Sequence, residues 1–341
     1  MAAQPTKSDV SQRDRLRQPV ELIARDLDDD LRRAYQVTGH WNDAGQTDRL
    51  ATAALHRALE RLSATGCWGS ANRLPSQWLW QIVGHWLECG VLQWRARSKP
   101  RGYAGDFEML SMIVAREICG HPLGAAFDRY FQAQAAPQAV RNRTELVGDA
   151  IAALIRQRPT GSIRVVSIGS GPALDLQRAC DQLTWQQRQQ LHLVLLDLDP
   201  VALDDANSRL ASRIPPGQLQ PIRENLFRLA QPVRSRKYLA DADILVCTGL
   251  FDYLDDDDAA AMLSRFWQAL PSGGKAWVFN FAPHNPSRAY MEWIGNWYLN
   301  YRTAEQMSRL ASQASIPPHQ VQIAAEPSGI DLYWQISKPA G

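Results

Sequence analysis

Two glycines and a carboxylate make the clearest ligand-binding pattern in this sequence. Gly169 and Gly171 lie in "RVVSIGSGPALDLQRA", where a β-rich run, a turn and a helical segment follow one another. Glycine lets a backbone turn tightly and approach a ligand, and the helix that follows presents its N-terminus. The next β-rich run ends in "LLDLDP", so Asp197 stands at its carboxyl end, where a carboxylate can accept hydrogen bonds from both ribose hydroxyls. The pattern predicts a nucleoside-binding site, with a plain strand-to-helix turn as the alternative.

The kind of nucleotide follows from what the glycine turn lacks. A dinucleotide fingerprint has a third glycine, and Leu174 occupies that position here, which disfavours a nicotinamide oxidoreductase. A P-loop needs a lysine that "GSGPALD" does not contain. A ligand with an adenosine and no phosphates suits such a turn. We therefore predict S-adenosylmethionine as the cofactor.

The stretch "KPRGYAGDFEML" predicts a shaped loop that leads into a helix. Its two glycines permit tight bends, and Asp106 can cap a helix that starts at Phe107. A sulfonium attracts aromatic faces and carboxylates, so Tyr103 and Asp106 are candidate cofactor contacts. Arg101 would project from the same loop. The alternative is an ordinary helix-entry turn with a surface arginine.

A second stretch, "EWIGNWYLNYRT", combines aromatic residues with an arginine. The aromatic residues recur at helical spacing, so a packing face is the plain interpretation. Arg302 could clamp a substrate carboxylate with both arms of its guanidinium. His284 could be a base, but a lone loop histidine more often has no such role, so we assign no catalytic acid or base. The predicted acceptor-binding residues are Arg101, Tyr103, Asn280, Tyr298, Tyr301 and Arg302.

Four consecutive aspartates, Asp255–Asp258, raise the question of a metal site. Negative charge at a helix N-terminus contributes about 0.3–1 kcal/mol. We therefore predict that they begin the helix "AAAMLSRFWQAL", and we predict no metal.

The bulk composition excludes several classes of protein. The chain has 341 residues, 45% of them hydrophobic and 21% charged, as in an ordinary globular protein. A net charge of +2 is too small to indicate nucleic acid or an anionic membrane as a partner. No apolar run approaches the roughly 18 residues of a membrane span. Five scattered cysteines without a C-x-x-C pair favour reduced thiols in a cytoplasm.

The elements that position these residues fall into two parts with different periodicity. Up to about residue 157, apolar residues recur at spacings of three and four, which predicts helices. Beyond Gly161, β-rich runs alternate with helical segments, which predicts a parallel α/β sheet with a closing antiparallel hairpin. We expect residues 1–11 to be disordered, 12–158 to form a helical lid or substrate domain, and 159–341 to form the cofactor-binding domain. The main strands are expected at 164–168, 191–196, 244–247, 276–281, 321–325 and 332–337.

Residues 160–341 resemble the class I S-adenosylmethionine-dependent methyltransferases. The matching pieces, in the family's order, are "VVSIGSGPA", "LLDLDP", "NLF", "DILVCTGLFDYL" and "LPSGGKAWVFNF". The resemblance implies a Rossmann-like sheet of seven strands with the last strand antiparallel. Ser167 departs from the family, because many members carry an acidic residue there, and how the cofactor's amino group is held stays open. From the methionine and ribose portion to the adenine and the pocket floor, the implied cofactor-binding residues are Gly169, Ser170, Gly171, Asp197, Leu198, Asn225, Leu226, Thr248 and Gly249.

A narrower resemblance rests on "PRGYAGDF" and "EWIGNWYLNYRT", which are similar to bacterial 3-hydroxypalmitic acid methyl ester (extracellular factor) synthases. It implies methyl ester formation on a small (3-hydroxy) fatty or organic acid, in secondary metabolite or signal biosynthesis. A carboxylate acceptor needs no general base. This is compatible with the sequence, which offers no obvious one. A thioether, as in methionine S-methylation, or a nitrogen of a small amino-acid-like metabolite is the alternative acceptor. A non-catalytic methyltransferase-like binding domain is disfavoured by the intact "GSG" and Asp197, and the oligomeric state stays open.

Overall fold

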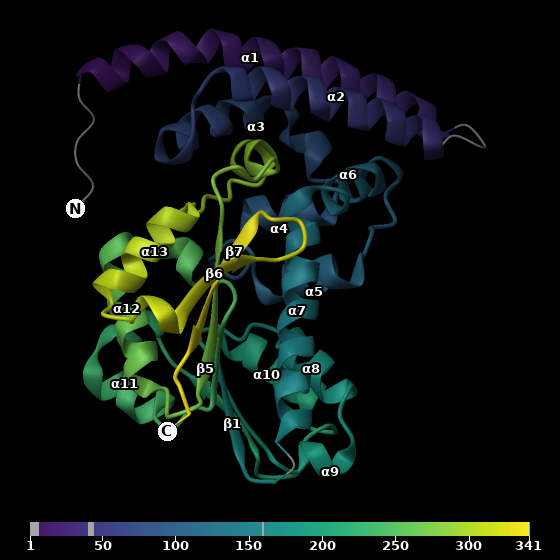
Figure 1. Ribbon diagram of the computed structural model, residues 1–341. Coiled ribbons are helices and arrows are strands. Elements are labelled where there is room, and N and C mark those ends of the chain that lie inside the picture. Colours follow the sequence, from purple (N-terminus) through teal and green to yellow (C-terminus); the bar gives the residue numbers. More distant parts are fainter. Residues whose placement is uncertain (1–6, 40–43, 159, 341) are drawn as a thin grey trace. The chain divides into compact units, whose positions relative to one another are not determined.

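A computed structural model describes residues 7–39, 44–158 and 160–340, which fall into two compact units (Figure 1). The helical unit comprises Met1–Pro137 and Pro286–Tyr298, and the sheet unit comprises Gln138–Asn285 and Leu299–Gly341. The predicted disorder at 1–11 lies outside the described residues except at 7–11, which are helical. The predicted domain boundary at 158 stays a prediction, because compactness alone does not show where an independently folding domain ends.

The sheet unit is built on seven strands in the order β3-β2-β1-β4-β5-β7-β6. Neighbouring strands from β3 to β5 pair in parallel, whereas β7 is antiparallel to both β5 and β6. The predicted seven-stranded methyltransferase sheet with an antiparallel last strand is therefore confirmed. The strands are β1 (Ile163–Ile168), β2 (Leu191–Asp197), β3 (Leu219–Arg223), β4 (Ile244–Cys247), β5 (Lys275–Phe281), β6 (Val321–Ala325) and β7 (Asp331–Ser337).

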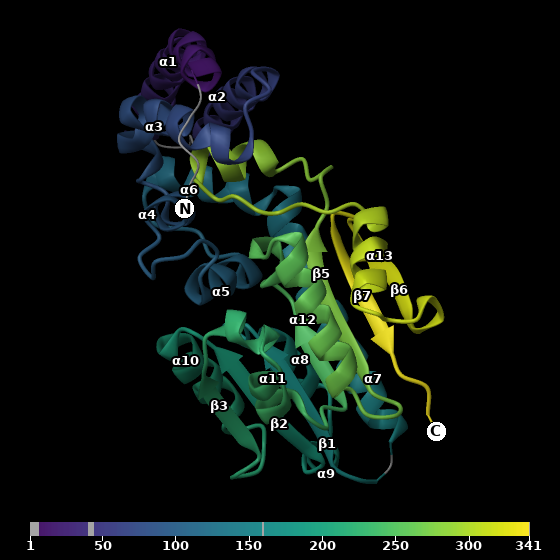
Figure 2. The same cartoon turned by 90° about the vertical axis from the view of Figure 1, so that its left-hand side faces the viewer.

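Helices cover both faces of this sheet, as Figure 1 shows from the side, and Figure 2 shows the same unit turned by a quarter. One face carries α7, α8 and α10, and the other carries α11, α12 and α13. Strands buried on both faces need continuous apolar runs, which explains why β1, β2 and β4 consist mainly of Val, Ile and Leu. The helices are α7 (Ala135–Gln157), α8 (Leu174–Asp181), α9 (Trp185–Arg188), α10 (Pro200–Leu210), α11 (Pro232–Leu239), α12 (Asp256–Ala269) and α13 (Ala304–Gln313).

Aromatic residues close the two hydrophobic layers of the sheet unit. Phe251 packs against Phe266 and Trp334, with ring centroids 5.9 and 5.5 Å away, and all three are fully buried. On the opposite face Phe279 stacks on Tyr333 at 4.8 Å. Truncating such a side chain to alanine typically costs about 3–5 kcal/mol, so this core supports the sheet edge firmly.

The helical unit packs its long first helix against two others. Buried leucines of α1 and α2 recur at helical spacing, as the sequence predicted, and include Leu27, Leu31 and Leu55. A short π-helix, Tyr290–Ile294, returns to this unit after β5, and its Tyr290 ring stacks on Phe131 at 5.0 Å. No helix in the described part of the chain is long and apolar enough to cross a membrane. The helices are α1 (Lys7–Gln36), α2 (Ala44–Ala64), α3 (Arg73–Leu87), α4 (Val91–Ser98), α5 (Phe107–Ala115) and α6 (Pro122–Gln132).

Candidate active site

The strand register gathers the predicted ligand-binding residues at one edge of the sheet. Ile168 of β1 pairs with Leu196 of β2, so the glycine turn and Asp197 leave the sheet side by side. The antiparallel β7 contributes its first residue to the same edge, because Asp331 lies opposite Phe281, the last residue of β5. In an open α/β sheet this carboxyl edge is where ligands bind.

The glycine turn has the tight geometry that the sequence predicted. Gly169 and Gly171 have φ angles of 65° and 48°, in the left-handed region that favours glycine. The N–H groups of Gly169 and Ser170 donate to the carbonyl of Leu196 at 2.8 and 3.1 Å, which ties the turn to β2. A Cβ placed on Gly169 would lie 3.4 Å from Cδ1 of Leu226, so these two residues face each other.

Asp197 is held so that its carboxylate can still accept hydrogen bonds. Its side chain is largely buried; one oxygen accepts from the N–H of Gly171 at 2.8 Å and the other from the N–H of Asp199 at 2.9 Å. An ionised carboxylate has about four lone-pair sites, so each oxygen retains one for a ribose hydroxyl. Burial raises the pKa of Asp197 above its ordinary value, and the charge of Asp199 adds to this, while the backbone hydrogen bonds oppose it.

Two large apolar side chains stand exposed beside Asp197. Leu198 is 53% exposed, and so is Phe227, which follows the β3 strand. Asn225 caps the short 3₁₀ helix Leu226–Ala230 by accepting from the N–H of Phe227 at 3.2 Å. Leu198, Asn225 and Leu226 were predicted from family resemblance alone. Phe227 was missed, because an exposed phenylalanine has no signature in a linear sequence.

The comparisons with known proteins agree with this geometry. Residues 166–276 match the family model described as a methyltransferase domain, a match that spans the glycine turn and Asp197. The sheet order is the one that this family implies. This protein is an S-adenosylmethionine-dependent methyltransferase of class I. No curated protein matches the chain of this methyltransferase.

Two solved structures share the fold of the methyltransferase over most of its length. A protein from Bordetella parapertussis, described as a possible exported protein, has a TM-score of 0.55 at 17% identity, with 95% of this chain and 97% of that chain covered. The carbon methyltransferase CurJ has a TM-score of 0.51 at 14% identity, with 95% and 92% covered. At such identities the likeness shows the fold alone.

The glycine turn and Asp197 have a geometry that fits S-adenosylmethionine. The spare lone pairs of Asp197 suit the two ribose hydroxyls, and the left-handed glycines leave room for a ligand against the backbone. The methyltransferase offers no phosphate-binding lysine in this turn, in keeping with a cofactor without phosphates. The individual contacts of Ser170, Leu198, Thr248 and Gly249 with the cofactor stay predictions.

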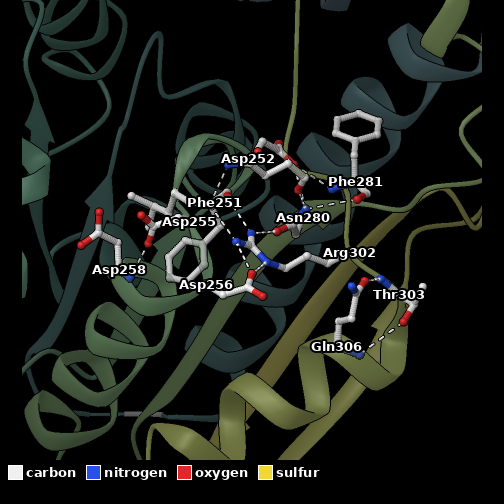
Figure 3. A network of polar contacts seen from close by, with 12 residues as sticks. Phe251, Asp252, Asp255, Asp256, Asp258, Asn280, Phe281, Arg302, Thr303 and Gln306 are labelled. Atoms are coloured by element: carbon white, nitrogen blue, oxygen red, sulfur yellow. Dashed lines mark hydrogen bonds and ion pairs between the residues drawn. The ribbon is translucent and has the colours of Figure 1, made fainter. Parts of the chain in front are cut away.

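The other half of the edge is occupied by a buried polar network around Arg302 (Figure 3). The guanidinium donates to the carbonyls of Phe251 and Leu254 at 2.9 and 2.7 Å, and to Oδ1 of Asn280 at 2.6 Å. Its remaining N–H groups meet Asp256 at 2.9 Å through both Nε and Nη2. All five donors of this side chain are therefore used within the sheet unit. The predicted role of Arg302 as a substrate clamp stays a prediction, and its contacts favour a positioning role.

Asp252 links the two ends of this network. Its Oδ1 accepts from the backbone N–H of Phe281 at 2.8 Å and from the amide of Asn280 at 3.1 Å (Figure 3). Burial raises the pKa of Asp252 to about 6, opposed by the Phe281 hydrogen bond and by the charges of Arg143 and Arg302. Asn280, a predicted acceptor contact, is fully buried and bonded on both sides of its amide, so its role toward the acceptor also stays a prediction.

Arg143 and Asp331 form a buried ion pair that the sequence did not reveal. Nη1 of Arg143, on α7, lies 2.9 Å from Oδ2 of Asp331, and both side chains are almost completely buried. A Cβ on Gly249, the predicted pocket floor, would lie 3.8 Å from Nη2 of Arg143. Burial raises the pKa of Asp331 to about 8, opposed by Arg143 and reinforced by the nearby charge of Asp252. Arg143 carries no local signal, because it reaches this edge from a helix outside the family motifs.

The loop of the helical unit has the shape that its sequence predicted. Gly102 and Gly105 have φ angles of 86° and 67°, and Asp106 caps α5 by accepting from the N–H of Met109 at 2.9 Å. The same oxygen of Asp106 accepts from Nε of Arg95 at 2.7 Å. Asp106 thus fixes the loop, and its predicted contact with the cofactor stays a prediction, as does that of the half-exposed Tyr103.

The loop of the first stretch packs, within the helical unit, against residues 296–297 of the second stretch. A Cβ on Gly105 would lie only 2.4 Å from the ring of Trp297, so no larger residue fits there. Nζ of Lys99 donates to the carbonyl of Asn296 at 2.8 Å. The close approach of the Trp297 ring therefore requires glycine at position 105. The predicted acceptor contacts of Tyr298 and Tyr301 stay predictions.

The aspartate run begins a helix, as predicted. Asp255 is the N-cap of α12 and accepts from the N–H of Asp258 at 2.9 Å. Among the residues described, no group of three or more His, Cys, Asp or Glu side chains is arranged to hold a metal ion.

Proposed function

We propose that this methyltransferase acts on the carboxylate of a small (3-hydroxy) fatty or organic acid and forms its methyl ester. When bound, S-adenosylmethionine would supply a methyl group on a sulfonium: the carboxylate oxygen would bond the methyl carbon as the carbon–sulfur bond breaks and S-adenosylhomocysteine leaves. The protein's task is then to desolvate and align a nucleophile that already carries its charge. Positioning of this kind can lower the activation barrier by about 7–11 kcal/mol.

The observation that carries this proposal is that the acids around β4, β5 and β7 are buried and each contacts other protein groups. Asp252 accepts two hydrogen bonds from protein groups, and Asp331 is ion-paired with Arg143. His284 bonds the carbonyl of Gly329 at 3.0 Å. An acceptor that needs no proton removed fits such an edge better than a neutral hydroxyl does.

Arg101 is the arginine that we propose as the partner of the acceptor carboxylate. Its guanidinium lies over the ring of Phe107 at 5.0 Å, and Nη1 is 3.4 Å from Glu108. Arginine meets both carboxylate oxygens with its planar fork, so Arg101→Lys should raise the KM for the acceptor about tenfold. Tyr103, in the same loop, is proposed to order the sulfonium through its aromatic face.

Label transfer tests the proposal directly. The full chain is incubated with S-adenosylmethionine labelled in its methyl group and a panel of 3-hydroxy fatty acids, short organic acids, thioethers and primary amines. We expect label only in the acids, in a product that releases labelled methanol on alkaline hydrolysis. Label in a thioether would instead favour S-methylation, which also needs no base, and label in an amine would favour N-methylation; either result would reject ester formation.

A further inference from the structure

Three cationic side chains of the helical unit lie where the start of α3 meets the end of α4, and one of them covers the ring of Tyr298. Cζ of Arg73, at the start of α3, lies 4.9 Å from the centre of that ring. Arg97, in the last turn of α4, donates to the hydroxyl of Ser76 at 2.6 Å and covers the ring of Trp80 at 4.8 Å. We call Arg73, Arg97 and Lys99 the cationic cluster.

Lys99, the C-cap of α4, is the third member of the cluster. Its φ angle of 49° is left-handed, which is unusual for a residue with a side chain, and Nζ is held by the carbonyl of Asn296 at 2.8 Å. Burial lowers the pKa of Lys99, and the charges of Arg73 and Arg97 lower it further. Burial also lowers the pKa of Arg97 to about 10. The three charges therefore lie within electrostatic range of one another.

No carboxylate neutralises the cationic cluster. Over the described ranges, none of its three members forms an ion pair with an aspartate or a glutamate. Glu292, whose charge adds to burial in raising the pKa of Tyr298, is already bound by Nε of Arg288 at 2.7 Å and by the N–H of Gly69 at 2.6 Å. Holding like charges together without a counter-ion is unfavourable, so the arrangement is suited to an anion that arrives from outside.

We propose that the cationic cluster binds the carboxylate of an organic acid. Two guanidinium groups supply planar forks for two oxygens, and Lys99 supplies a third donor. The faces of Tyr298 and Trp80 suit the apolar part of such an acid. The cluster lies in the same segment as the loop with Arg101, which follows Lys99 by two residues.

Calorimetry on the full chain without cofactor tests this binding site. The probes are octanoate, octan-1-ol and inorganic phosphate. Octanoate should bind the wild type, and Arg73→Gln and Lys99→Met should each weaken it roughly tenfold, as expected for a lost charge-assisted hydrogen bond. Octan-1-ol should bind all three proteins equally, because it lacks the charge. Both substitutions are at partly exposed positions, and an unchanged thermal midpoint shows that the variants fold.

The matched control is Arg17→Gln. Arg17 is also an exposed arginine near an aromatic ring, 5.9 Å from Trp78, but it is paired with Glu21 at 2.8 Å. This variant should leave octanoate binding unchanged. Equal octanoate affinity in the wild type, Arg73→Gln and Lys99→Met would overturn the proposal, as would the absence of octanoate binding or tighter binding of phosphate through the same residues.

The two proposals fail separately. Octanoate binding that depends on the cluster, together with label transfer only to a thioether or an amine, would keep the carboxylate site and reject ester formation. Label transfer to an acid with octanoate binding insensitive to the cluster would keep ester formation and reject this site.

Discussion

The two halves of the sheet's carboxyl edge hold similar residue types and use them differently. Around β1, β2 and β3, Asp197 keeps lone pairs available, and Leu198 and Phe227 are each 53% exposed. Around β4, β5 and β7, Arg302 and Asn280 are buried and bonded within the protein. Hydrogen-bonding capacity that the protein leaves unused marks a ligand site, whereas capacity that it uses completely marks support for the fold.

Removing Arg302 should have the largest effect, because it would disrupt the half of the edge around β4, β5 and β7, where polar groups bond within the protein. Arg302→Met leaves Asp256, Asn280 and two carbonyls without their donor, and we expect the free energy of unfolding to fall by about 3–5 kcal/mol. Urea denaturation measures it. The control Arg178→Met, which removes an exposed pair with Asp149, should cost less than about 1 kcal/mol. If Arg302→Lys kept wild-type stability and lost turnover on an acid, Arg302 would be the substrate clamp after all.

Asp197→Asn changes the half of the edge around β1, β2 and β3, and it should lower cofactor affinity rather than stability. Cofactor affinity should fall by about 1.5–3 kcal/mol, because a charged acceptor of the ribose hydroxyls is lost, while stability changes little. Calorimetric titration with S-adenosylhomocysteine measures the affinity. Asp205→Asn, at a half-buried pair with Arg209 on α10, serves as the control. Wild-type affinity in a folded Asp197→Asn protein would refute the cofactor placement.

Phe227→Ala tests whether the exposed Phe227 ring contributes to cofactor affinity without contributing to stability. The ring is exposed, so stability should stay within about 0.5 kcal/mol, yet affinity for the adenosyl group should drop by about 0.5–1.5 kcal/mol if the ring packs on the adenine. Val233→Ala removes a more exposed apolar side chain, on α11, and should change nothing. Equal affinity for Phe227→Ala and the wild type would remove this residue from the site.

The smallest effect concerns pH and follows from the raised pKa of Asp197. Lowering the pH protonates a carboxylate of raised pKa earlier than an ordinary aspartate, so affinity for S-adenosylhomocysteine should weaken as the pH falls below neutral. The free protein should show the reverse trend at this residue, because a raised folded pKa favours the folded state as pH falls. Asp197→Asn should remove both dependences. A parallel pH profile in the variant would assign them to another group.

Local sequence determined the elements and the half of the edge around β1, β2 and β3. The glycine turn, the carboxylate after β2, the caps at Asp106 and Asp255 and the closing hairpin each depend on residues close together in the chain. Backbone conformation follows from such short-range patterns, and the resemblance to the methyltransferase family predicted the seven-stranded sheet with its antiparallel last strand.

Only the tertiary structure decided which polar residues are free to bind a ligand. Arg302 resembles a clamp in the sequence, but its five donors are used by groups 22 to 51 positions away. Arg143 meets Asp331 across 188 positions. Whether a polar group is satisfied depends on partners that folding brings from distant parts of the chain, and a linear pattern does not contain them.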